Sequence, residues 1–295
     1  MPQTLHQRSE QLLKERIARL RPNQQAFRFI FLGDSRGTGN NCFLSGEFEL
    51  VLKQAVARNP LFIVHGGDTV FSGTQPFLQH FVEIVEKFAP QIPMFCCVGN
   101  HDELFNGTSN LQNFRATIGE VHWRINVPQF HFRCIALNNV INPGSPTMAP
   151  IYGFTNSELA YLERQLKNIP RNTLLAMHVQ PSAGRWKGKT FDGFPVTTPN
   201  NKKFLQLVTQ HQAKIKRVLV SHIHAYDQQF IKQNSMLQIG RNTNYILSRG
   251  AGAPLDTNPL LTYTNFNFTE FTVTKNRVSS PDLFRVFGTP TTKCL

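Results

Sequence analysis

This 295-residue chain is poor in the features that mark membrane, exported and repeat proteins. No apolar run approaches the roughly 20 residues that a transmembrane helix needs. The N-terminus is polar and basic and has no apolar core of the kind found in secretory signals. We find no internal repeat and no low-complexity tract. These absences argue against a membrane protein, and we expect a cytoplasmic location.

Cysteine is also scarce and shows no recognisable spacing. The chain has five cysteines, an odd number without the paired spacing of a zinc site. Cys96 and Cys97 are adjacent inside an apparent buried strand. We therefore expect five reduced, structural thiols in a cytosolic protein. A secreted chain that had lost its signal would show the same pattern, so this alternative stays open.

Acidic residues are outnumbered by basic ones. The chain has 18 Asp and Glu against 31 Lys and Arg, a formal net charge of +13 and a pI near 9.9. A basic surface attracts phosphate-bearing substrates, and it leaves nucleic acid open as a partner. The basic residues are scattered, with the densest runs at 185–189, 202–203 and 214–217. No RNA-recognition, helix-turn-helix or zinc-finger pattern is present, and net charge alone favours only nonspecific attraction.

Polar clusters follow a series of apolar runs that indicate buried strands. The apolar runs are 27–32, 61–64, 94–98, 174–177 and 218–220. The clusters that follow them are Gly33–Arg36, Gly67–Val70, Gly99–Asp102, His178 and Ser221–His224. In open α/β sheets, ligands bind just beyond the carboxyl ends of the strands. The sequence therefore predicts that these distant residues meet in one site, within one domain.

The residue types in these clusters favour a metal site. Carboxylate, amide oxygen and imidazole without thiolate suit Mn, Fe, Zn, Ni or Mg. Two aspartates offset the charge of two cations, and Asp68 could bridge them. Two ions about 3.5–4 Å apart can hold a hydroxide nucleophile and clamp a phosphoryl oxygen. A single Gly-Asp turn or a lone histidine is usually structural, so the prediction depends on the ordered set.

The order of these motifs resembles the calcineurin-like metallophosphoesterases. The resemblance runs from about Phe27 to about Gly288, and Gly99–Asp102 is its most specific segment. It implies a hydrolase of phosphomonoesters or phosphodiesters that uses a metal-activated hydroxide and two divalent ions, with Mn, Fe, Zn or Ni as candidates. One ion would be held by Asp34, Asp68 and His224, and the other by Asp68, Asn100, His178 and His222. His101 would donate a proton to the leaving oxygen, with Asp102 as its partner.

Three positions depart from the family pattern. Arg36 stands where many members have a histidine ligand, and a guanidinium cannot ligate a cation because it stays protonated. Phe71 stands where purple acid phosphatases use a tyrosine, and Ser221 where glycine is usual. The first metal site could then use more water or recruit Asn40 or Asn41. Arg36 either grips the substrate phosphate or points to solvent.

Helical and strand periodicity predicts two mixed β-sheets packed face to face with helices outside, an αββα sandwich of the α/β class. Helices are expected at 5–20, 48–56, 77–88, 155–170 and 204–208, the fourth of them opened by a capping box at Thr155–Glu158. Two strands between 121 and 138 meet at a turn, and later strands are expected at 228–231, 236–239, 245–247, 267–274 and 283–287. We divide the chain into an N-terminal helical extension, 1–25, and a single domain, 26–290.

Two loops could determine the choice of substrate. The loop at 138–152 could cover the site, and the loop at 180–198 carries Arg185, Trp186 and Lys187. We expect these three to contact substrate, because binding residues concentrate on loops over a scaffold. The alternative is a solvated surface loop. Two further functions also stay open: a noncatalytic metal-binding module, favoured by Arg36 and Phe71, and a nuclease acting on polymeric nucleic acid.

Overall fold

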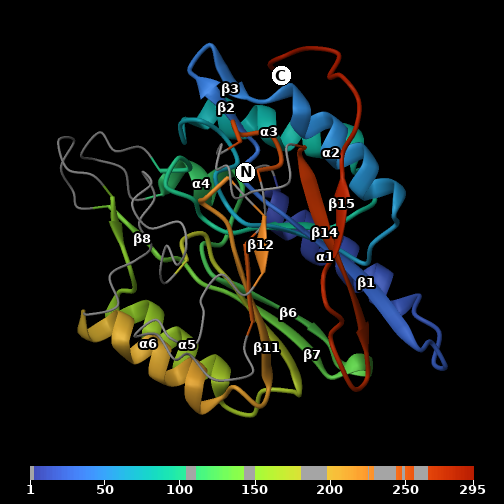
Figure 1. The fold of residues 1–295 in the computed structure, drawn as a ribbon, viewed down its shortest axis with the longest axis vertical. Helices are drawn as coiled ribbons and strands as arrows, with labels where there is room; N and C mark the ends of the chain where they lie inside the picture. The colour runs from blue at the N-terminus through green and yellow to red at the C-terminus, as the bar shows by residue number, and fades with distance from the viewer. Residues whose placement is uncertain are drawn as a thin grey trace.

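Two β-sheets form the centre of the molecule (Figure 1). The computed structural model describes residues 3–103, 111–142, 150–180, 198–224, 226–228, 244–247, 250–255 and 265–295. The first sheet has the strand order β15-β14-β1-β4-β5. Its strands are β1 (Ala26–Leu32), β4 (Ile63–His65), β5 (Met94–Cys96), β14 (Asn267–Thr274) and β15 (Asp282–Arg285). β1, β4 and β5 are parallel, whereas β14 is antiparallel to β1 and β15.

The second sheet has the order β12-β13-β11-β10-β7-β6. Its strands are β6 (Trp123–Val127), β7 (Phe132–Ala136), β10 (Asn172–Ala176), β11 (Ile215–Val220), β12 (Asp227–Gln228) and β13 (Asn244–Leu247). β7, β10, β11 and β13 are parallel, and the short helix η1 (Pro128–Phe130) forms the predicted turn between β6 and β7. Two small hairpins, β2 (Arg36–Gly39) with β3 (Cys42–Leu44) and β8 (Val140–Ile141) with β9 (Ile151–Tyr152), lie outside the sheets. The strand predicted at 236–239 and the end of that predicted at 228–231 lie outside the described residues.

Both faces of the first sheet are buried, which explains why the sequence of β1 is apolar almost throughout. Phe27, Phe29 and Phe31 belong to the core between the two sheets. Ile30 and Leu32, on the opposite face, belong to the core beneath the outer helices. Successive side chains of a strand alternate between its faces, so a strand buried on both sides has no polar alternation.

Helices cover the outer face of each sheet. α2 (Gly46–Ala57), α3 (Gln75–Phe88) and α4 (Gln112–Thr117) contribute to the core behind the first sheet. α5 (Asn156–Leu166) and α6 (Pro199–Gln210) contribute to the core behind the second. Figure 1 shows α2 and α3 on one side of the sheets and α5 and α6 on the other. The predicted αββα sandwich is confirmed.

The N-terminal helix α1 (Leu5–Ala18) packs against the edge of the first sheet. Thr4 and Gln7 form a capping box: Gln7 N–H donates to Thr4 Oγ1 at 3.3 Å, and Thr4 N–H donates to Gln7 Oε1 at 3.0 Å. The Ser9 hydroxyl donates to Met94 O at 2.8 Å and accepts from Met94 N–H at 3.0 Å on the edge strand β5. These bonds satisfy groups that an edge strand would otherwise leave open. The boundary between extension and domain at 25/26 stays a prediction.

Two local predictions about α5 differ from the structure. Thr155 caps the helix by accepting from Glu158 N–H at 3.2 Å. The Glu158 carboxylate does not complete the predicted box, because it accepts from Asn138 N–H at 2.9 Å and lies 3.2 Å from His122 Nδ1. The helix also ends at Leu166, before the predicted end near 170. Asn168 there adopts a left-handed φ of 56°, which helical residues do not take.

The prediction that all five cysteines are reduced is wrong. Cys42 and Cys294 form a disulfide across a sequence separation of 252 residues, with Cα atoms 5.1 Å apart. The C-terminal segment lies along β3, where Leu295 N–H donates to Leu44 O at 3.0 Å. Cys96, Cys97 and Cys134 are free and buried, as expected. The sequence gives no signal for a pair so far apart.

None of the described helices is long and apolar enough to cross a membrane.

Candidate metal centre

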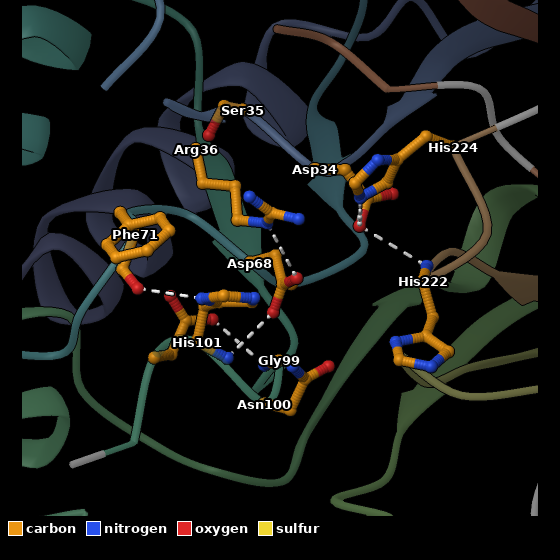
Figure 2. Close-up of polar contacts among 12 residues, drawn as sticks. Asp34, Ser35, Arg36, Asp68, Phe71, Gly99, Asn100, His101, His222 and His224 are labelled. Carbon is orange, nitrogen blue, oxygen red and sulfur yellow. Dashed lines mark hydrogen bonds and ion pairs between the residues drawn. The ribbon is translucent and has the colours of Figure 1, made fainter. Parts of the chain in front are cut away.

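The predicted ligands come together at the carboxyl ends of strands from both sheets (Figure 2). Asp34 follows β1, Asp68 follows β4 and Asn100 follows the region of β5, whereas His178 and His222 follow β10 and β11. Asp34, Asp68 and His222 have left-handed φ angles of 55°, 54° and 74°. Such conformations cost energy for residues other than glycine and are concentrated at functional sites. These sharp turns therefore place the three residues directly beyond the ends of their strands.

The loops that carry the predicted ligands pack closely against one another, because glycines stand where any side chain would collide. A Cβ on Gly99 would collide with the backbone and Oδ1 of Asp68. A Cβ on either Gly33 or Gly66 would collide with the hydroxyl of Ser221. Ser221, which stands at a position where glycine is usual, is thus accommodated because its neighbours are glycines.

His178 is the residue whose surroundings fit a cation most clearly. Its Nδ1 lies 2.8 Å from Gly66 O, which can only accept, so Nδ1 carries the proton. Burial lowers the pKa of His178, so the ring is neutral and Nε2 presents a lone pair. That lone pair lies 3.1 Å from Asn100 Oδ1 and 3.3 Å from Asp68 Oδ1. With Nδ1 carrying the ring proton, no proton lies between Nε2 and these two oxygens, an arrangement that fits a bound metal ion.

The two aspartates differ in their surroundings. Burial acts to raise the pKa of Asp68, but His178, His101 and Arg36 together outweigh it and lower that pKa. Burial, followed by the charge of Asp68, raises the pKa of Asp34 well above its ordinary value. Asp34 Oδ1 accepts from His222 N–H at 3.2 Å, while its buried Oδ2 has no hydrogen-bond partner among the described residues. A cation would satisfy that oxygen.

His224 lies beside Asp34. Its Nδ1 is 2.7 Å from Pro254 O, and its Nε2 is 3.8 Å from Asp34 Oδ1. Burial and then the charge of Arg36 lower the pKa of His224 to about 4, so the ring is neutral at pH 7. The neutral ring can act as a ligand.

His101 is oriented by a backbone carbonyl. Its backbone N–H donates to Asp68 Oδ1 at 2.9 Å, and its ring Nδ1 lies 2.7 Å from Phe71 O. The predicted partner Asp102 is elsewhere: its carboxylate accepts from Thr69 N–H and Gly99 N–H, each at 2.8 Å. Asp102 therefore joins two ligand-bearing loops instead of holding His101. Burial and then the charge of Asp68 raise the pKa of Asp102 to about 7.

Arg36 faces the site, and the solvent alternative is wrong. Its side chain is 14% exposed, and its Nε lies 3.5 Å from Asp68 Oδ2. Nη1 donates to Gly37 O at 3.1 Å, and Cζ lies 5.9 Å from the centre of the Phe71 ring. Figure 2 shows the guanidinium directed toward the carboxylates. Phe71 thus contacts both Arg36 and His101, although its own side chain offers no ligand.

Several predicted residues are not brought to the site, or lie beyond the described part of the chain. Asn40 and Asn41 are exposed at the turn between β2 and β3. Arg185, Trp186 and Lys187 fall outside the described residues.

His65 and Asn139 support the site and were missed in the sequence. His65 Nδ1 accepts from Gly67 N–H at 3.2 Å, its Nε2 lies 3.0 Å from Ser35 Oγ, and that hydroxyl donates to Thr69 O at 2.8 Å. Burial and then His178 lower the pKa of His65 to about 3. The side chain of Asn139 bonds both backbone groups of Val179, next to His178. His65 stands between an apolar run and the Gly67–Val70 cluster, and Asn139 stands in a loop, so neither belongs to a motif.

Comparisons with known proteins bear on this geometry. The family model for calcineurin-like phosphoesterases matches residues 13–226. A search of curated protein sequences finds no significant match. The purple acid phosphatase PPD1 from yellow lupin (Lupinus luteus) seeds aligns with a TM-score of 0.62 and 16% identity, covering 86% of this chain and 50% of its own. This chain thus spans about half the length of the lupin protein.

Two further structures share the fold. PhoD aligns with a TM-score of 0.57 and 8% identity, over 89% of this chain and 69% of its own. GAP50, described as the anchor in the inner membrane complex of Plasmodium, aligns with a TM-score of 0.53 and 13% identity, over 91% of each chain. At these identities the likenesses establish the fold alone.

Proposed function

The chain belongs to the calcineurin-like phosphoesterase family, and from this premise we propose that it is a metal-dependent hydrolase of phosphomonoesters or phosphodiesters. The observation that carries the proposal is the meeting of His178 Nε2, Asp68 Oδ1 and Asn100 Oδ1. The three atoms come from loops of both sheets, and although Asp68 Oδ1 also accepts from His101 N–H, no proton lies between Nε2 and either oxygen. Electron-rich atoms that face one another repel, and a bound cation would offset that repulsion.

The residues present fit a divalent metal centre. The resemblance implies two ions of Mn, Fe, Zn or Ni, one held by Asp68, Asn100, His178 and His222 and the other by Asp34, Asp68 and His224. Neutral imidazoles, carboxylates and an amide oxygen are the ligands these metals accept. Metal bound there would polarise a phosphoryl oxygen and acidify a water molecule.

The protein's own groups have separate tasks. His101 is held by Phe71 O through Nδ1, so the ring must also carry a proton on Nε2, as the imidazolium, to give it to the departing oxygen. The Nη2 of Arg36 has no partner among the described residues and is available to a phosphoryl oxygen. We also propose that Arg185, Trp186 and Lys187 contact the rest of the substrate.

The test is a reconstitution screen. Protein purified without chelator is analysed for metal, stripped, and reloaded with Mn, Ni, Fe or Zn before mono- and diester model substrates are offered. We expect metal-dependent hydrolysis of at least one ester class. Protein that binds these metals but hydrolyses neither class would contradict the proposal.

Arg36 beside Asp68 supports a second candidate, a noncatalytic metal-binding module. It predicts metal binding without turnover in the same screen. The formal charge of +13 supports a third, a nuclease, for which affinity for polymeric nucleic acid should fall steeply with salt.

A cytoplasmic location stays a prediction. The Cys42–Cys294 disulfide is typical of oxidising compartments. The disulfide predicts three reactive thiols after denaturation of protein isolated from its native source, which would oppose the cytoplasm; five reactive thiols would support the cytoplasm and contradict the disulfide.

A further inference from the structure

We propose that the guanidinium of Arg36 takes the place of one of the two divalent cations, so that the centre holds a single ion enclosed by Asp34, Asp68, Asn100 and His178. The proposal rests on the proposed function, because it concerns the same site. It changes the composition of the centre: one metal ion and one fixed organic cation share the work.

The ligand atoms converge on one position. Asp34, Asp68 and His178 each offer an atom within 4.8 Å of those of the other two, and all three residues are buried. Asn100 Oδ1 joins them at 3.1 Å from His178 Nε2. Within the described part of the chain, His224 does not belong to this group of mutually close atoms. The geometry thus supplies a four-residue ligand set for one ion.

Arg36 occupies the other side of the shared carboxylate. Asp68 turns Oδ1 toward His178, 3.3 Å away, and Oδ2 toward Arg36 Nε, 3.5 Å away. A carboxylate that bridges two cations presents one oxygen to each, and here the cation at Oδ2 is a guanidinium. Figure 2 shows Asp68 between Arg36 and the Asn100 loop.

The guanidinium is fixed in this position. The backbone N–H of Arg36 donates to the backbone carbonyl of Asp68 at 3.2 Å, and the guanidinium Nη1 donates to Gly37 O at 3.1 Å. The Phe71 ring lies beneath Cζ at 5.9 Å. Arginine cannot be deprotonated in proteins, so a divalent ion placed at Asp68 Oδ2 would meet a permanent like charge.

The charges and hydrogen bonds suit this division of work. As ligands of an ion, Asp34 and Asp68 would together carry two negative charges, which one divalent ion and one guanidinium already exceed. The guanidinium can neutralise a phosphoryl oxygen through Nη2, whereas it cannot acidify a water molecule. Arg36 therefore serves the substrate, and the activation of water belongs to the single ion.

Metal stoichiometry tests the proposal without an activity measurement. Chelator-stripped protein is titrated with Mn²⁺ by calorimetry, bound metal is counted by mass spectrometry, and electron paramagnetic resonance distinguishes an isolated Mn²⁺ from a coupled pair. We expect wild type to bind one equivalent with the spectrum of an isolated ion. Arg36→His, which removes the permanent charge and adds an imidazole, should bind a second equivalent and show a coupled pair.

Two control variants sharpen the result. Arg36→Lys keeps a positive charge and should stay at one equivalent. Arg28→Ala removes an arginine from β1 that pairs with Glu270, away from the ligand cluster, and should also stay at one. Wild-type stoichiometry needs no variant, so the test holds even if Arg36→His fails to fold.

The outcomes separate this inference from the proposed function. Two coupled ions in wild type, or one equivalent in well-folded Arg36→His, would overturn the role of Arg36 whether or not the protein hydrolyses esters. One isolated ion in wild type with a second in Arg36→His supports the inference, even if the reconstitution screen finds no turnover. Wild type that binds no Mn²⁺ would overturn it together with the metal centre.

Discussion

Replacing His65 by glutamine tests how the stability of the protein depends on pH through the buried hydrogen bonds of His65. His65 links the loop of Ser35 to the loop of Gly67 through its two ring nitrogens, and its side chain is completely buried. Because Nδ1 accepts a backbone N–H, a second proton on the ring would break that bond. Glutamine keeps a polar side chain at this position but cannot take up a proton.

The sign and the size follow from the pKa of His65. Burial lowers it from the ordinary 6.5 to about 3. A depressed histidine pKa means that the stability is fully present above pH 6.5 and is lost as the pH falls toward 3. The loss is about 1.4 kcal/mol per pH unit, or about 3 kcal/mol between pH 6.5 and pH 4. The variant loses hydrogen bonds worth about 1–2 kcal/mol at every pH but escapes this acid penalty.

The assay is denaturant unfolding of chelator-stripped protein from pH 8 to pH 4. We expect wild type to be the more stable protein at pH 8, and the difference between the two to shrink or reverse by about 3 kcal/mol at pH 4. His80→Gln is the matched control, because it removes an imidazole from the exposed side of α3. Parallel curves for wild type and His65→Gln would refute the assignment of the acid loss to His65.

Two further perturbations follow from the contacts. His101→Gln should keep its metal while turnover falls about 10²–10⁴-fold, most for alkyl esters with poor leaving groups; equal slowing of alkyl and nitrophenyl esters, measured by steady-state kinetics, would show that His101 does not protonate the leaving oxygen. Replacing both Cys42 and Cys294 by serine should lower the free energy of unfolding by about 2–4 kcal/mol and abolish its response to reductant, because the disulfide holds the C-terminal segment on β3. A wild-type unfolding curve unchanged by reductant would count against that role.

The loops that carry the candidate metal ligands could be predicted because each depends on local sequence. An apolar strand followed by a short polar cluster places its side chains at the end of a sheet, and this holds for Asp34, Asp68 and His178. The αββα layers followed in the same way from the alternation of strand and helix patterns. The sequence pattern therefore identified those residues whose location is decided by the strand that they follow.

Contacts that depend on three-dimensional approach could not be predicted. The placement of Asp102 on Thr69 and Gly99 depends on how two loops pack, and the Cys42–Cys294 pair depends on where the C-terminus lies. The orientation of the Arg36 side chain likewise depends on the backbone of the neighbouring loop, which the sequence does not place. Sequence motifs name candidate ligands, but they do not show which oxygen of Asp68 meets which cation.

The most direct test of the metal-dependent phosphoesterase is His178→Ala, assayed for bound metal and ester hydrolysis in the same preparation. The change removes the imidazole whose Nε2 meets Asp68 and Asn100, while His80→Ala removes a surface imidazole as the control. We predict that His178→Ala loses bound metal and hydrolysis together, and that the control keeps both. A folded His178→Ala protein with wild-type metal content and wild-type hydrolysis would contradict the account.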